Sequence, residues 1–180
     1  MPNIIALDTG LHRLGYCHLR YDDTGFELKD YGTFETDSKH CRGERLYGIQ
    51  QFLDDLFHIP CCVFKDEYEN VETLVYEYPC FTNKQSQVLG TVIGIIEFSY
   101  YEFSYEEAIS ISPTEVKKKI CGNGTASKSQ VKLGVIRKLQ ENNIELDLSK
   151  ELDDTIDAIA IALVTYDNLC KESQEKNYDS

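Results

Sequence analysis

The chain has 180 residues, of which 42% are hydrophobic and 27% charged, and its formal net charge is −13. This length suits one globular domain that buries about 70% of the surface of its unfolded chain. No stretch approaches the roughly 18 consecutive apolar residues of a membrane span, and no basic region precedes the first apolar stretch, which argues against a secretory signal.

The N-terminal part of the chain is predicted to form an antiparallel meander followed by a helix. An apolar run ends in Asp8, two residues before Gly10, as is typical of a buried strand that meets a turn. Further along, strand-forming residues alternate around an Asp-Asp-Thr-Gly turn, and apolar residues then recur at helical spacing. The predicted strands are 4–8, 15–21 and 26–34, the helix is 45–57, and 58–70 is a surface loop.

The remaining chain alternates between strand and helix signals. A β-rich run ends at Glu77, Pro113 is placed to open one helix, and Ser127 is placed to cap the next. The predicted strands are 71–76 and 108–111, and the predicted helices are 84–101, one from 113, one from 127, and 149–170. We therefore expect one α/β domain over residues 1–170 and a polar, frayed tail over 171–180.

The seven cysteines are an odd number, and none belongs to a CxxC pair. Their spacing indicates reduced thiols in a cytosolic compartment, so we expect a cytoplasmic protein without membrane association. The four histidines do not supply the closely spaced ligand pairs of structural zinc, which we do not expect here.

Basic residues concentrate in one segment of this acidic chain. Residues 112–139 contain seven lysines and arginines and a single acid, Glu115, for a net charge of +6 (7 − 1). The rest of the chain then carries −19 (−13 − 6). Because phosphate binding depends on Lys and Arg, the segment is a candidate nucleic-acid surface, although a solvated helix face is the usual origin of such a cluster.

Acidic residues stand at two predicted strand ends and on one helix face. Asp8 ends the first strand and Glu77 the fourth, while Asp154 and Asp157 are three residues apart on the last helix and share a face. Carboxylates beside a buried stripe must be paired, hydrated or bound to a cation, and Mg²⁺ prefers oxygen ligands. Any one acid is more simply a solvated group or a helix charge, as Asp153 is, but the set of four is a candidate metal site.

Four segments resemble bacterial RuvC resolvases, in the order in which that family has them. The most specific is Ser-Pro-Thr-Glu-Val-Lys-Lys-Lys at 112–119 with Gly-Asn-Gly-Thr-Ala-Ser-Lys-Ser-Gln-Val at 122–131. Leu-Asp-Thr-Gly at 7–10 resembles the family's first-strand motif, and Glu77 with the following helix resembles its second acid. Residues 154–162 resemble its last catalytic helix, so that the resemblance spans about residues 4–165.

The resemblance implies an α/β fold of the RNase H type, a mixed five-stranded sheet flanked by helices. It implies a Holliday-junction resolvase, a homodimer that makes paired nicks across a four-way DNA junction. Each active site would use two Mg²⁺ ions, and Mn²⁺ would substitute for them. The implied catalytic residues and cation ligands are Asp8, Glu77, Asp154 and Asp157. Lys117 and Lys128 match family lysines that serve the active site and the DNA backbone, and the expected DNA-binding set is completed by Lys84, Lys118 and Lys132.

The chain departs from the family pattern at several positions. Thr9 replaces the family's proline, Leu14 its usual threonine, and 91–93 read Thr-Val-Ile in place of Gln-Ala-Arg. The family also has an aromatic residue that stacks on an unpaired base after the second acid, and Phe81 is the nearest candidate here, with core packing an equal alternative. These differences leave open a divergent, phage-type enzyme with a wider range of branched-DNA substrates.

The helix predicted at 84–101 is the expected dimer interface. Gly90 and Gly94 are four residues apart and share one face with Ser86, so that two backbones could approach closely. The alternative is that both glycines let this helix pack on its own sheet.

Two other functions are alternatives to a nuclease. An ATP-binding protein of actin-like fold would use an Asp-Thr-Gly turn for phosphate, but such proteins need a duplicated domain and this chain is too short. A junction-binding protein without catalysis is disfavoured because all four acids are present. The sequence does not determine the cleavage-sequence preference, the source, or whether a branch-migration partner is needed.

Overall fold

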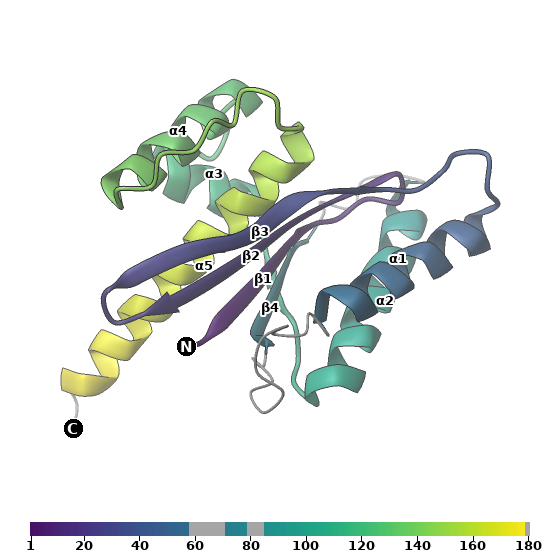
Figure 1. Ribbon diagram of the computed structural model, residues 1–180, viewed down its shortest axis with the longest axis horizontal. Coiled ribbons are helices and arrows are strands. Elements are labelled where there is room, and N and C mark those ends of the chain that lie inside the picture. The colour runs from purple at the N-terminus through teal and green to yellow at the C-terminus, as the bar shows by residue number, and fades with distance from the viewer. Residues whose placement is uncertain (58–70, 79–84, 179–180) are drawn as a thin grey trace.

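A computed structural model describes residues 1–57, 71–78 and 85–178, and its centre is a mixed five-stranded sheet (Figure 1). The first three strands form the antiparallel meander that the sequence predicts, and β4 and β5 continue the sheet in parallel with β1. The strand order is β3-β2-β1-β4-β5. The strands are β1 (Asn3–Asp8), β2 (Arg13–Asp22), β3 (Gly25–Glu35), β4 (Val71–Glu77) and β5 (Ile109–Ile111).

Helices cover both faces of the sheet. The first pair, α1 (Arg42–Phe57) and α2 (Gln85–Ser104), packs on one face, where Ile5 and Leu7 of β1 point. The other three, α3 (Pro113–Cys121), α4 (Lys128–Glu141) and α5 (Asp153–Tyr178), lie on the face to which Ile4 and Ala6 point. Because side chains of a strand alternate between faces, one short strand contributes to two separate cores.

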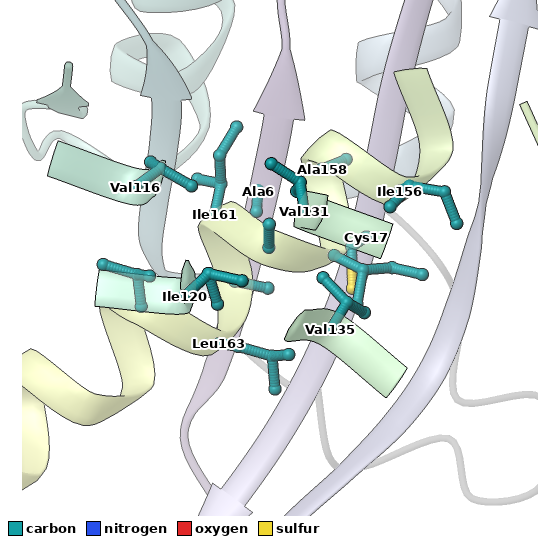
Figure 2. Packing of buried hydrophobic residues seen from close by; sticks show 14 of the residues in the cluster. Ala6, Cys17, Val116, Ile120, Val131, Val135, Ile156, Ala158, Ile161 and Leu163 are labelled. Carbon is teal, nitrogen blue, oxygen red and sulfur yellow. The ribbon is translucent and has the colours of Figure 1, made fainter. Parts of the chain in front are cut away.

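Helix α5 forms the middle layer of its face, between the sheet and the pair α3–α4. Figure 2 shows Ala158 and Ile161 of α5 among Ala6 of β1, Val116 of α3 and Val131 of α4. Small side chains allow this close packing, since alanine recurs at 158, 160 and 162. None of the described helices is long and apolar enough to cross a membrane.

Local signals placed the starts of α3 and α4 correctly. Ser112 accepts a hydrogen bond from the backbone of Glu115, and Pro113 is the first helical residue of α3. Ser127 and Gln130 form a capping box that fixes the start of α4 at Lys128.

The predicted bounds of two other helices were wrong. Helix α1 begins at Arg42 rather than 45, because the Glu44 carboxylate accepts a hydrogen bond from the Cys41 backbone at 2.8 Å and caps an earlier turn. Helix α5 begins at Asp153 rather than 149, because residues 147–151 form a turn closed by a hydrogen bond from the Glu151 backbone to Leu148. It also continues to Tyr178, through most of the segment predicted as a frayed tail.

Candidate functional site

Two carboxylates meet at one edge of the sheet because their strands are parallel neighbours. β1 ends at Asp8 and β4 at Glu77, and the register pairs Leu7 with Tyr76 immediately before them. Alternation along each strand points both acids to the face covered by α5, since Ala6 and Val75, two residues earlier, belong to that core. The predicted placement of each acid at a strand end is therefore correct, and the structure adds that the two ends adjoin.

The N-terminal end of α5 lies directly on β2, and a glycine makes this contact possible. A Cβ atom at Gly15 would lie 2.0 Å from the backbone oxygen of Asp154, so no larger residue fits there. Gly15 is the β2 partner of Asp8 in the sheet, which brings the first turn of α5 next to Asp8. Thr155 adds a 2.8 Å hydrogen bond to Thr33 of β3. The sequence places Gly15 at the start of the second predicted strand, but sequence reasoning did not identify this contact.

The acids are close enough to perturb one another's ionisation. Burial raises the pKa of Asp8 well above its usual value, and the negative charges of Glu77, Asp157 and Asp154 raise it further. Burial and the charge of Asp157 likewise raise the pKa of Glu77 to about 7. The pKa of Asp157 is raised chiefly by burial. The four predicted acids thus form one electrostatic cluster, here called the carboxylate cluster.

Two lysines supply positive charge to the carboxylate cluster. Lys128 Nζ lies 3.9 Å from a carboxylate oxygen of Asp157 and 3.3 Å from one of Asp153, at the start of α5. The charge of Lys128 lowers the pKa of Asp8, Glu77 and Asp157, and Lys117 does so for the last two. Lys128 thus contacts the acids directly, and Lys117 acts on them only through its charge. Asp153, which sequence reasoning had set aside, is one of the partners of Lys128.

The donor chemistry of the carboxylate cluster fits a hard divalent cation. Its members offer oxygen ligands only, and they crowd negative charge into a partly buried space, which a cation would neutralise. Within residues 1–57, 71–78 and 85–178, however, no three potential ligand side chains converge tightly enough to form a ready-made ion site. The four acids therefore suit Mg²⁺ by type and by charge, with side-chain adjustment on binding.

Internal ion pairs occupy part of the basic segment. Lys119 contacts Glu115 at 3.1 Å and Asn168 of α5, and Lys138 pairs with Asp167 of α5. Three lysines of the segment form no ion pair with the described residues, namely Lys117, Lys118 and Lys132. The net charge of +6 counted for this segment is thus larger than the positive charge that remains free to bind an external phosphate.

The predicted dimer helix presents its glycines to open space. A Cβ atom added at Gly90 or Gly94 would meet none of the described residues within 4 Å, and both glycines are exposed. Among the described residues, these glycines therefore do not pack on the protein's own sheet. Farther along the same helix Phe98 and Tyr101 are more than half exposed, at 57% and 54%. Sequence reasoning missed these aromatics, whose exposure depends on how α2 is rotated.

Two further predicted DNA contacts, Phe81 and Lys84, lie outside the described residues. Four of the seven cysteines lie inside them, at 17, 41, 121 and 170, and these are free thiols.

The mixed sheet with helices on both faces is an α/β fold of the RNase H type, the class that the resemblance implied. The sequence profile described as crossover junction endodeoxyribonuclease RuvC matches residues 4–165. The chain therefore belongs to the crossover junction endodeoxyribonuclease RuvC family.

Individual relatives match over nearly the whole chain. The RuvC of Prochlorococcus marinus (strain MIT 9211) is 32% identical over 165 residues, which are 91% of this chain and 94% of the relative. That of Alkaliphilus oremlandii is 31% identical, over 89% of this chain and 90% of the relative.

Solved structures share the fold at lower sequence identity. Thermus thermophilus RuvC in complex with a Holliday junction substrate matches with a TM-score of 0.72 and 21% identity, over 90% of this chain and 91% of that one. The Fowlpox virus resolvase in complex with substrate Holliday junction DNA matches with a TM-score of 0.57 and 17% identity, over 93% and 98% of the two chains.

Proposed function

We propose that this protein resolves four-way DNA junctions by hydrolysing a phosphodiester bond at the carboxylate cluster. The observation that carries the proposal is that Asp8, Glu77 and Asp157, from three separate elements, lie partly buried and close together, so that Glu77 and Asp157 raise the pKa of Asp8 and Asp157 raises that of Glu77. Such crowding of like charges is costly for folding alone, and functional sites are where it is commonly found. Because the chain belongs to a nuclease family, binding of a catalytic cation explains why the acids are crowded together.

The four acids would hold Mg²⁺ ions, two in the family arrangement, with Mn²⁺ able to substitute. Bound cations of this kind activate a water molecule and stabilise the oxygen that leaves. In the protein, the edge of the sheet and α5 fix the positions of the acids, while Lys117 and Lys128 offer positive charge to a phosphate beside them. Since bound cations would activate the water, this mechanism does not require a histidine or cysteine as catalytic base.

The DNA backbone would contact the unpaired cations of the basic segment. Lys118 is exposed and Lys117 and Lys132 are half-buried, and ion pairs occupy none of them among the described residues. Lys119 and Lys138 are assigned instead to holding α3 and α4 against α5. The acidic remainder of the surface repels DNA and so disfavours binding of plain duplex away from this face.

A homodimer would place two carboxylate clusters on one junction, and α2 is the surface we assign to it. The open glycines Gly90 and Gly94 and the exposed aromatics Phe98 and Tyr101 follow one another at spacings of three and four residues, along a single helix face. Glycine inside a helix costs roughly 1 kcal/mol relative to alanine, so two glycines that contact none of the described side chains favour an intermolecular contact.

The proposal is tested by Asp8→Asn in a cleavage assay on a synthetic four-way junction with Mg²⁺. The substitution removes a cation ligand but adds no bulk, so cleavage should be lost while junction binding in a gel-shift assay persists. Asp55→Asn on α1, an exposed acid on the opposite face of the sheet, is the matched control and should cut normally. Wild-type cleavage by Asp8→Asn would refute the assignment, and a panel with a three-way junction and a linear duplex measures substrate range.

A further inference from the structure

The contact between Lys128 and Asp153 is not explained by the proposed chemistry. Asp153 occupies the first position of α5 and is exposed, whereas Asp8, Glu77 and Asp157 are partly buried. It therefore lies at the rim of the carboxylate cluster. Lys128 nevertheless lies closer to Asp153, at 3.3 Å, than to Asp157, at 3.9 Å.

The geometry gives Lys128 two alternative partners one helical turn apart. Asp153 and Asp157 are separated by four residues, which places them on the same face of α5. The backbone of Lys128 is fixed by the capping box at the start of α4, so only its flexible side chain can move between them. Asp153 and Lys128 are both exposed, at 60% and 63% of the side chain, whereas Asp157 is 24% exposed.

We propose that Asp153 is a positioning residue that draws Lys128 away from Asp157 and so frees the carboxylate cluster for a divalent cation. An ammonium group beside Asp157 competes with a cation for the same carboxylate, because both neutralise the same charge. Asp153 offers the ammonium group an equivalent partner outside the cluster. The inference rests on the proposed function, since it assumes that the carboxylate cluster binds the cation.

The alternative is that Asp153 acts only as a general negative charge at a helix start. Such a charge would attract any cation through space, whether or not Lys128 is present. The two explanations therefore predict different dependence on Lys128, and a double-mutant cycle separates them.

The test measures Mg²⁺ affinity of the full chain by calorimetry, without DNA, and checks it by the Mg²⁺-dependent rise of the unfolding temperature. Asp153→Asn should weaken Mg²⁺ binding about threefold, the scale of a lost exposed ion pair. Lys128→Met should strengthen it, and in the Lys128→Met background Asp153→Asn should have no further effect. Asp153→Glu should restore wild-type affinity.

Glu151→Gln removes the same charge two residues earlier and is the matched control, which should leave affinity unchanged. Equal weakening by Asp153→Asn with and without Lys128 would overturn the inference, as would no weakening in either background. Failure of the proposed function gives a different result, because then the wild type would bind no Mg²⁺ or Asp8→Asn would bind it as tightly as the wild type does.

Discussion

Glu77→Gln should stabilise the protein at alkaline pH in the absence of divalent cations, although it removes a proposed catalytic group. Glu77 lies largely buried beside Asp157, and the two carboxylates repel each other when both are ionised. Glutamine has nearly the same shape and no charge. The substitution therefore removes the cost of burying a charge, which is the larger effect, and the repulsion by Asp157, without opening a cavity.

The size of the effect follows from the pKa of Glu77, which folding raises from 4.5 to about 7. Each pKa unit corresponds to about 1.4 kcal/mol, so the ionised Glu77 destabilises the folded state by about 3 kcal/mol. A raised carboxylate pKa means that the folded state binds the proton more tightly than the unfolded state. The cost is therefore absent below about pH 4.5, grows between about pH 4.5 and 7, and is fully present above that range.

Urea unfolding in the presence of a chelator at about pH 8 and about pH 4.5 provides the measurement. The free energy of unfolding of the variant should exceed that of the wild type by up to about 3 kcal/mol at the higher pH and by little at the lower pH. Glu145→Gln changes an exposed acid between α4 and α5 and controls for the loss of one negative charge. Its free energy of unfolding should differ little from that of the wild type at both pH values. A variant no more stable than the wild type at about pH 8 would refute the argument that burial and the charge of Asp157 make ionised Glu77 costly.

Four other substitutions test the packing, the assignment of DNA-binding lysines and the dimer surface. Gly15→Ala should lower the unfolding temperature sharply and abolish cleavage, because the added Cβ would clash with the Asp154 backbone. Lys118→Ala should reduce the slope of log affinity for the junction against log salt by about 1, whereas Lys138→Ala should leave the slope unchanged and reduce stability. Gly94→Leu should give a monomer in light scattering that is still folded by circular dichroism, since no described residue of the same chain obstructs the new side chain. A dimer that persists would exclude α2 as the interface.

Features that depend on neighbouring residues in the chain could be predicted from the sequence. Alternation identified the strands that end at Asp8 and Glu77, and short-range hydrogen bonding fixed the helix starts after Ser112 and Ser127. The family resemblance then supplied what local rules cannot, namely that these two acids belong to one set of cation ligands.

Features that depend on distant contacts could not be predicted. Lys119 and Lys138 look identical to Lys118 in the sequence, but their partners lie on α5, about 30 to 50 residues away along the chain. The same limit applies to α2, where only the rotation of the helix shows that Gly94 faces outward. Charge counting along a segment therefore measures potential surface charge rather than the charge available to a ligand.

The packing of α5 explains why the repulsion within the carboxylate cluster persists. From Thr155 to Thr165 every residue except Asp157 is buried, between the sheet on one side and α3–α4 on the other (Figures 1 and 2). A helix packed on both sides cannot rotate or shift to separate its acids from Asp8 without losing core contacts worth several kcal/mol. The remaining way to lower the energy is to bring in positive charge, from Lys128, from protons, or from a divalent cation. A rigid core thus keeps the carboxylate cluster in a state that favours cation binding.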